Sequence, residues 1–205
     1  TVNAVNDVPI LTEIGPQVTD EDTDFSIDLS ASDVDIDENG QTLSFSAVSS
    51  DESLVTVSTT TSDSGRTGTL TFDVLDDQNG SAQITVSVTD SEEATDSEVF
   101  TLTVNAVNDV PILTFIGPQS TDEDSDTTIV LSASDVDIDE NNQTLTFSAV
   151  SSDESLVMVS TTTEGDGTSG TLTFDVQSEQ NGTAEITVTV TDSEGVTDSE
   201  AFTLT

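Results

Sequence analysis

The sequence predicts an all-β protein built from two tandem β-sandwiches, and three observations support this prediction. The chain of 205 residues aligns with itself after a shift of 102 residues, and 80 of the 103 aligned positions are identical. Within each copy, apolar residues alternate with Ser and Thr, which is the period of a strand with one buried face. Turn-forming pairs such as Gly15-Pro16, Asn39-Gly40 and Asn79-Gly80 separate the alternating stretches. We therefore expect repeat 1 over residues 1–103 and repeat 2 over residues 104–205.

About seven strands are expected in each repeat. In repeat 1 the first should lie near residues 8–14, before Gly15-Pro16, and a short fourth strand near residues 54–58. Seven strands in about 100 residues is the count of an immunoglobulin-like sandwich, here without the Cys pair and Trp of antibody domains. The other five strands follow from the alternations Phe25/Ile27/Leu29/Ala31, Leu43/Phe45/Ala47, Leu70/Phe72/Val74, Ala82/Ile84/Val86/Val88 and Phe100/Leu102/Val104.

One exchange between the repeats concerns a large aromatic residue. Repeat 1 has Glu13 and Phe25 where repeat 2 has Phe115 and Thr127. Each repeat thus keeps four Phe residues while one of them moves from the second expected strand to the first. We expect both positions to border a single core, so that the exchange is compensatory.

The charge balance excludes many functions. The chain has 42 Asp and Glu, a single Lys or Arg (Arg66), no His and no Cys, for a net charge of -41. Binding nucleic acid or an anionic membrane surface requires cationic side chains, so neither partner is expected. The usual zinc, iron–sulfur and haem sites and the Ser–His or Cys–His pairs of hydrolases are also excluded, and we expect no enzyme activity. The groups that remain are carboxylates, amides and hydroxyls, which are the ligands that Ca²⁺ prefers.

Strand parity sorts the acidic loops to opposite poles of each sandwich. Loops after the second, fourth and sixth strands share the pole where the chain enters, and the others share the opposite pole. Like charges 4–5 Å apart repel by roughly 3–4 kcal/mol at an effective dielectric near 20, so such clusters need a counter-ion. We expect Ca²⁺ there, with purely solvated acidic loops as the alternative. At the junction of the repeats the expected ligands are Asp20, Glu21, Asp22, Asn105, Asn108, Asp109, Asp135, Asp137, Asp139, Asp192 and Glu194. The same positions in the other copy add Asn3, Asn6, Asp7, Asp33, Asp35, Asp37, Asp90 and Glu92 at one end and Asp122, Glu123 and Asp124 at the other.

The triplet Asp33-x-Asp35-x-Asp37 has the spacing of the first three ligands of an EF-hand. Glu38 stands where that loop requires Gly, and its twelfth position is Ser44 rather than Glu. The triplet is therefore not an EF-hand. It indicates a metal-binding site only together with the linker residues and the acids of the first loop.

The linker Asn105-Ala106-Val107-Asn108-Asp109-Val110-Pro111 resembles the Asn-Asp-x-Pro linker of cadherin-like repeats in very large bacterial surface adhesins, including RTX adhesins. The loops Thr19-Asp20-Glu21-Asp22 and Asp33-Val34-Asp35-Ile36-Asp37 are also similar to that group. The resemblance implies extracellular, cell-surface extender modules that bind Ca²⁺ and hold a distal adhesive region away from the cell. It implies that Glu21, the pair Asn108-Asp109, and Asp135 with Asp137 bind the ion. The change of Asp76-Asp77 to Ser178-Glu179 departs from the pattern.

From these observations we expect a monomeric rod whose partners are the neighbouring repeats of the same chain. The register of the two ends leads us to expect an excerpt from a longer array. Two alternatives remain open. One is a module that grips a glycan or protein directly, which an exposed aromatic residue unique to one copy would favour. The other is homophilic adhesion through paired sandwiches.

Overall fold

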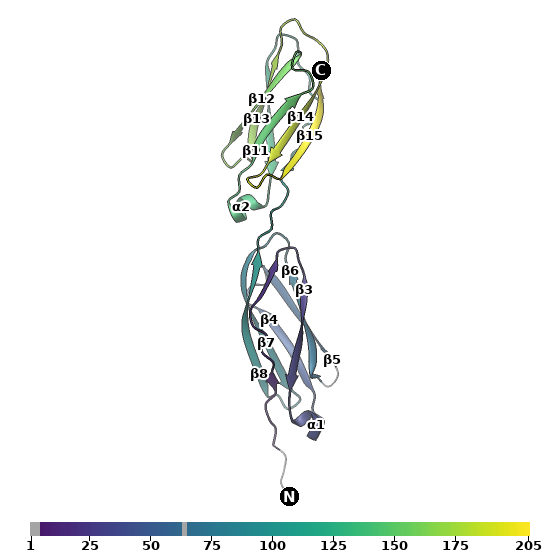
Figure 1. Cartoon of the computed structure of the whole chain (residues 1–205), viewed down its shortest axis with the longest axis vertical. Helices are drawn as coiled ribbons and strands as arrows, with labels where there is room; N and C mark the ends of the chain where they lie inside the picture. The colour runs from purple at the N-terminus through teal and green to yellow at the C-terminus, as the bar shows by residue number, and fades with distance from the viewer. Residues whose placement is uncertain (1–4, 63–64) are drawn as a thin grey trace. The chain divides into compact units, whose positions relative to one another are not determined.

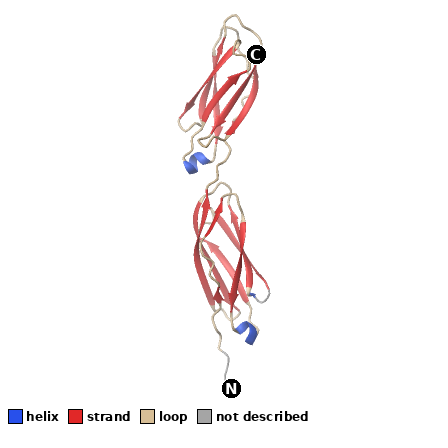
Figure 2. Cartoon of the chain, in the orientation of Figure 1, coloured by secondary structure: helices blue, strands red, loops and turns tan. Residues whose placement is uncertain are grey.

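The computed structural model describes residues 5–62 and 65–205, which form two compact units divided between Val107 and Asn108. Each unit is a β-sandwich with one short helix (Figures 1 and 2). The predicted fold class, two tandem immunoglobulin-like sandwiches, is confirmed. Residues 104–107 lie with unit 1, whereas the division by sequence assigned them to repeat 2. No helix in the described part of the chain is both long and apolar enough to cross a membrane.

Unit 1 packs two four-stranded sheets, with strand orders β1-β3-β6-β5 and β2-β8-β7-β4. Neighbouring strands are antiparallel except β2 and β8, which are parallel. The elements are β1 (Ile10–Leu11), β2 (Gln17–Asp20), β3 (Phe25–Ser32), α1 (Asp35–Asn39), β4 (Leu43–Ser49), β5 (Val55–Ser62), β6 (Thr67–Val74), β7 (Gly80–Asp90) and β8 (Thr95–Asn105).

Unit 2 repeats this plan with sheets of strand orders β12-β13-β10-β9 and β11-β14-β15. The stretch equivalent to β2 makes a single parallel bridge, between Gln119 and Leu204, and is not a strand. The elements are β9 (Ile112–Leu113), β10 (Thr127–Ser134), α2 (Asp137–Asn141), β11 (Thr146–Ser151), β12 (Val157–Glu164), β13 (Ser169–Val176), β14 (Ala184–Thr191) and β15 (Thr197–Leu204).

One hydrophobic core lies between the two sheets of each unit, and the alternating residues of the strands fill it. In β7, for example, Ala82, Ile84, Val86 and Val88 are all buried while the residues between them are not. Burying an apolar side chain of this size contributes about 1.5–3 kcal/mol, so this alternation is the main determinant of the fold. Because the buried residues of each core all come from one unit, each unit has its own core.

The first predicted strand is shorter than expected, and a second short strand follows it. The prediction covered residues 8–14, but only Ile10 and Leu11 pair with β3. Gly15, with φ +71°, and Pro16 then redirect the chain, and Gln17–Asp20 pairs with β8 of the other sheet. The alternation did not reveal β2, because Val18 is exposed and no strongly apolar residue of this strand is buried.

The acidic triplet begins a one-turn helix where a loop was expected. Helix α1 ends at Asn39 and is capped by Gly40, which has φ +68° and donates its amide hydrogen to the carbonyl of Asp35. In unit 2, Asn142 caps α2 in the same left-handed conformation, with φ 57°. Gly and Asn are the residues that most readily adopt this conformation, so the copies exchange one for the other without losing the turn.

The expected compensation between Phe25 and Phe115 is wrong. Phe25 stacks on Phe72 at the edge of the core of unit 1, with ring centroids 4.3 Å apart. Phe115, in contrast, is 81% exposed. The residue at position 115 follows β9 and lies outside the sandwich, so the two positions do not share a core.

Candidate functional site

The candidate site is the amino pole of each unit, the end where the chain enters the sandwich. In unit 1 we define it as Asn6, Asp7, Asp33, Asp35, Gln41 and Asp90, and in unit 2 as the equivalent residues Asn108, Asp109, Asp135, Asp137, Gln143 and Asp192. The linker, the loop around the short helix and the β7–β8 or β14–β15 turn contribute these side chains. Figure 1 shows α1 and α2 each at this end of its own unit.

Hydrogen bonds connect the amino pole of unit 1. Asn6 donates from Nδ2 to Asp90 Oδ2 at 2.9 Å, and Gln41 donates from Nε2 to Asn6 Oδ1. The amide of Asp7 donates to Asp35 Oδ2 at 2.8 Å, and the amide of Asp35 donates to Asp33 Oδ1 at 2.9 Å. Carboxylates from the loop around α1 and from the end of β7 are therefore brought together around the entering chain, which contributes the backbone amide of the exposed Asp7.

The amino pole of unit 2 has the same network. Asn108 donates to Asp192 Oδ2 at 2.9 Å, and Gln143 donates to Asn108 Oδ1. The amide of Asp109 donates to Asp137 Oδ2 at 2.8 Å, as its counterpart does in unit 1. The two copies of the sequence thus form the same set of hydrogen bonds, one in each unit.

Several of these carboxylates are buried. Asp35 and Asp90 in unit 1 and Asp137 and Asp192 in unit 2 expose 5% of their surface or less. Burying a charged group is costly unless it is paired or bound to a metal. In the described part of the chain the only ion pair is Arg66 with Asp37, at 2.6 Å, and Arg66 lies in one pocket with Asp7 and Asp33 at the amino pole of unit 1. None of the four buried acids belongs to that ion pair.

Some oxygen atoms in and near this network lack a hydrogen-bond donor. Among the described residues, the buried oxygens without a partner include Asp33 Oδ2 and Gln41 Oε1 in unit 1 and Asp135 Oδ2 in unit 2. A divalent cation with 6–8 oxygen ligands would satisfy such atoms. The donor set of carboxylate, side-chain amide and backbone oxygens fits Ca²⁺ and lacks the N and S ligands that zinc prefers.

The surroundings shift the pKa values of three acids. Burial, the largest influence, raises the pKa of Asp90, but hydrogen bonds from Asn6 and from the amides of Ala94 and Glu92 leave it below its ordinary value. Asp192 behaves in the same way: hydrogen bonds from Asn108 and from backbone amides outweigh burial and lower its pKa. Burial raises the pKa of Asp135, and the charges of Asp137 and Asp192 raise it further.

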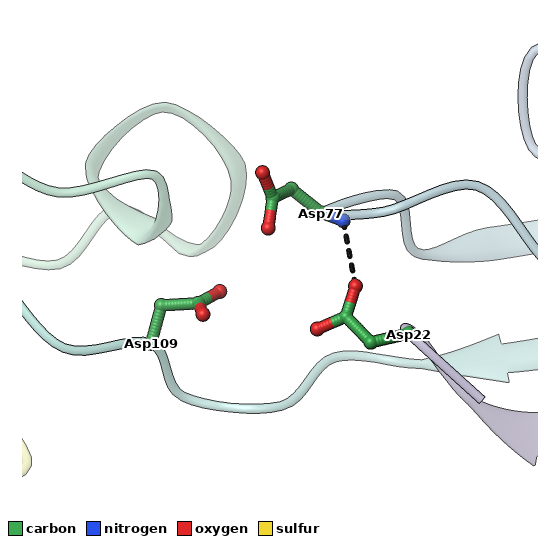
Figure 3. Close-up of side chains that lie close together, drawn as sticks. All are labelled: Asp22, Asp77 and Asp109. Carbon is green, nitrogen blue, oxygen red and sulfur yellow. Dashed lines mark hydrogen bonds between the residues drawn. The ribbon is translucent and has the colours of Figure 1, made fainter.

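The carboxyl pole of unit 1, at the opposite end, holds a second acidic group. Glu21 is only 2% exposed; its Oε1 accepts the amide hydrogen of Val107 at 2.6 Å, and its Oε2 has no hydrogen-bond partner among the described residues. Asp22 Oδ1 accepts the amide hydrogen of Asp77 at 3.0 Å (Figure 3). Asn105 donates to Asp20 Oδ1 at 3.0 Å, so Asn105 belongs to this pole of unit 1 and not, as expected, to the amino pole of unit 2. The corresponding Asp122, Glu123 and Asp124 of unit 2 are all exposed.

Some predicted ligands lie apart from these networks. Asp37 and Asp139 are exposed, and Asp37 pairs with Arg66. Glu92 and Glu194 are also exposed, and it is their backbone amides that donate to Asp90 and Asp192. Asn3 lies outside the described residues.

Sequence reasoning missed Gln41 and Gln143, which are buried in the amino poles. Both are retained between the copies, but a Gln after a turn has no distinctive spacing. It also missed a structural role for Asp96 and Glu98, which accept backbone amide hydrogens from the first strand and the turn after it. Asp198 and Glu200 do the same in unit 2.

The fold defines a tandem pair of immunoglobulin-like domains with acidic poles. The chain belongs to the family described as bacterial Ig domain, whose profile matches residues 6–103 and again 108–205. A search of curated proteins found no significant match.

Solved structures of cadherin repeats resemble the fold. Protocadherin gamma B2 domains 1–5 match with a TM-score of 0.56 and 19% identity over 98% of this chain and 39% of that chain. Protocadherin gamma B7 domains 1–4 match with a TM-score of 0.54 and 19% identity over 96% of this chain and 49% of that chain. The chain thus spans less than half of each, and at this identity the likeness concerns the fold alone.

Proposed function

We propose that the chain is a pair of Ca²⁺-binding extender repeats from an extracellular bacterial surface adhesin of the RTX-like kind. Ca²⁺ bound at the poles stiffens the connection between neighbouring repeats, which are the partners of each unit within one monomeric rod. The stalk formed in this way projects a distal adhesive region from the cell. The family of bacterial Ig domains and the cadherin-like fold support a role in adhesion or extension.

One observation carries the calcium part of this proposal. Buried carboxylates from two segments, the loop around the short helix and the end of the strand before the next turn, meet the entering chain at each amino pole. The single cation of the sequence, Arg66, pairs with Asp37, and buried oxygens at both poles lack hydrogen-bond donors among the described residues. In unit 1, Asp33, Gln41 and Asp90 would hold the ion together with Asp35, and in unit 2 Asp135, Asp137 and Asp192 would do so. The bound ion would neutralise part of the negative charge. The residues would bind the ion and hold the entering chain against the pole.

The concentration range suits an extracellular site. Extracellular calcium modules bind with dissociation constants of about 10⁻⁴–10⁻³ M. At 10 mM Ca²⁺ one such site would stabilise its unit by roughly 1.4–2.7 kcal/mol. For a domain of this size that corresponds to a melting temperature increase of roughly 6–20 °C.

A matched pair of variants tests the site. Asp137→Asn keeps an oxygen that can accept the amide hydrogen of Asp109 but removes a buried charge, whereas Asp139→Asn removes an exposed charge two residues away. Calorimetric melting of each variant in EDTA and in 10 mM Ca²⁺ should show most of the Ca²⁺-dependent increase for unit 2 lost in Asp137→Asn and kept in Asp139→Asn. Equal increases in the two variants would rule out the amino pole as the site.

A second candidate function is a module that grips a ligand directly, and Phe115 favours it. Phe115 and Val130 are 81% and 79% exposed, and repeat 1 has Glu13 and Asp28 at these positions. The double variant Phe115→Glu and Val130→Asp therefore installs residues that the fold already accepts in unit 1. In a glycan-array screen, bound glycans that the double variant no longer retains would support this candidate. Identical binding profiles for the parent and the variant would exclude it.

A further inference from the structure

The first and last segments of unit 1 lie side by side in the sandwich. Strand β2 pairs in parallel with β8, from Gln17 opposite Leu102 to Asp20 opposite Asn105. Both strands therefore run from the amino pole towards the carboxyl pole. A pull on the two ends of the unit draws the entering segment towards the amino pole and β8 towards the carboxyl pole. The bonds between the two segments are then loaded along the strands, in shear.

Two acids of β8 extend this connection towards the amino pole. Asp96 Oδ2 accepts the amide hydrogen of Leu11 at 2.9 Å. The two carboxylate oxygens of Glu98 accept the amide hydrogens of Ile14 and Gly15 at 2.8 and 3.0 Å. We call Asp96 and Glu98 the acid clasp of unit 1. Its partners advance in the same order along both segments, so the clasp continues the parallel β2–β8 connection.

The clasp uses amides that the sheet leaves available. Strand β1 is at the edge of its sheet and pairs with β3 alone, so only alternate amides of β1 face a neighbouring strand. The amide of Thr12 donates to the carbonyl of Ser30 in β3 at 2.9 Å, whereas the amide of Leu11 faces the other way and donates to Asp96. Because β8 belongs to the second sheet, the clasp joins the two sheets at the entering segment.

Unit 2 has the same clasp, formed by Asp198 and Glu200. Asp198 Oδ2 accepts the amide hydrogen of Leu113 at 2.9 Å. The two oxygens of Glu200 accept those of Ile116 and Gly117 at 2.7 and 3.0 Å. None of the acids of the two clasps is among the residues proposed above to hold Ca²⁺, so the clasps form without the ion.

Hydrogen bonds to an ionised acceptor are roughly twice as strong as those between neutral groups. We propose that the acid clasp of each unit is a calcium-independent mechanical fastening, which holds the entering segment to the last strand when the chain is under tension. Its bonds are loaded together with the β2–β8 ladder in unit 1, so they break together and not one after another. Only the source of the tension is taken from the proposed role as a stalk.

Single-molecule pulling of the 205-residue chain in EDTA, with handles at the two chain ends, tests the clasp. At constant load, Glu98→Gln should speed the unfolding of one unit by roughly tenfold or more, because bonds that break before the transition state put their whole loss into the unfolding rate. The other unit keeps its clasp and is the internal reference. Asp96→Ala removes only the bond to Leu11, so it should speed unfolding less, and it replaces Glu98→Gln if that variant does not fold.

Val57→Ala is the control for lost stability with an intact clasp. Val57 packs against the core of unit 1 from β5, which lies at the opposite edge of its sheet from β1. The substitution should lower the stability of unit 1 to urea but change its unfolding rate under load by less than about threefold. Equal acceleration by Val57→Ala and Glu98→Gln, or unchanged rates in both clasp variants, would overturn the proposal.

Repeating the measurement in millimolar Ca²⁺ separates the clasp from the proposed calcium sites. Glu98→Gln should give the same relative acceleration in EDTA and in Ca²⁺. An acceleration found in only one of the two solutions would contradict a calcium-independent fastening. Unfolding rates of the parent chain that do not respond to Ca²⁺ would count against the calcium sites, whereas the same acceleration by Glu98→Gln in both solutions would still support the clasp.

Discussion

At the scale of single residues, the acidic side chains discussed above fall into two groups. Some lie buried at the poles of the sandwiches, and others lie further along the last strand and accept amide hydrogens from the first strand and the turn after it. Glu98 belongs to the second kind: its two carboxylate oxygens accept the amide hydrogens of Ile14 and Gly15 at 2.8 and 3.0 Å. It therefore fastens the turn between β1 and β2 to β8.

We expect Glu98→Gln to destabilise unit 1 by about 1.5–3 kcal/mol, because one charged acceptor is replaced by an amide group that opposes a backbone donor. Urea denaturation measures the change. Glu52→Gln, at an exposed position, is the control and should change stability by less than about 0.5 kcal/mol. Equal effects of the two substitutions would show that the Glu98 contacts contribute nothing specific.

The Asp135 carboxylate should destabilise unit 2 in the absence of metal and should contribute to its stabilisation when Ca²⁺ is bound. Burial and the charges of Asp137 and Asp192 raise its pKa above the unfolded value near 3.9. A group of this kind favours folding fully below its unfolded pKa, and the contribution is lost as pH rises through the folded pKa. Asp135→Asn, which resembles the protonated form, should stabilise unit 2 in EDTA by on the order of 1 kcal/mol at pH 7 and by much less near pH 3.

The same substitution should reduce the stabilisation by Ca²⁺, since a ligand oxygen loses its charge. Chemical denaturation at both pH values, with EDTA or Ca²⁺ at pH 7, measures both effects. A variant that is less stable than the parent in EDTA at pH 7 would contradict this account of Asp135.

At the scale of elements, alternation of apolar residues predicted most strands correctly, because every second residue of a strand with one buried face is apolar. The β3 and β7 strands are examples, with Leu29 and Ile84 buried as expected. Alternation gives no signal for a strand that pairs through its backbone without burying apolar side chains. Strand β2 was missed for this reason, and α1 was missed because one helical turn is defined by its cap at Gly40 and not by periodicity.

The candidate site was predictable to a similar degree. Strand parity indicated that linker, first-loop and turn acids gather at poles, and Asp7, Asp35 and Asp90 do lie in one hydrogen-bonded network with Asn6. Parity assigns whole loops to a pole but does not give the direction of a side chain. For this reason it did not separate Asp35, which is buried, from Asp37, which is exposed.

The β12–β13 hairpin depends on one glycine. Gly167 has φ +92°, and a Cβ at this position would lie 2.0 Å from the carbonyl oxygen of Leu145. Gly165, in the same hairpin, has φ +60°, and a Cβ there would meet no neighbouring atom within 4 Å. Gly167→Ala should therefore cost about 3 kcal/mol or more, through strain and steric overlap.

Gly165→Ala is the matched control, and it should cost about 1–2 kcal/mol, for the left-handed conformation alone. Thermal unfolding of unit 2 measures both variants. Similar costs would mean that the hairpin moves away from β11 without penalty, contrary to the close packing described.

At the scale of the whole molecule, the net charge of -41 is the charge of the metal-free chain. Both units have the same hydrogen-bonded amino pole, so the proposed Ca²⁺ binding would be a property of each repeat. Bound Ca²⁺ would reduce the repulsion among acids at each pole and would make folding stability and stiffness depend on the extracellular Ca²⁺ concentration.

The most direct measurement of the central claim is small-angle X-ray scattering of the 205-residue chain in EDTA and in millimolar Ca²⁺, with melting curves under the same conditions. Ca²⁺ should lengthen the maximum dimension, narrow the range of conformations and raise the melting temperature, and Asp137→Asn should weaken all three effects. Scattering curves and melting temperatures that are the same in EDTA and in Ca²⁺ would contradict the account of these repeats as a calcium-stiffened stalk.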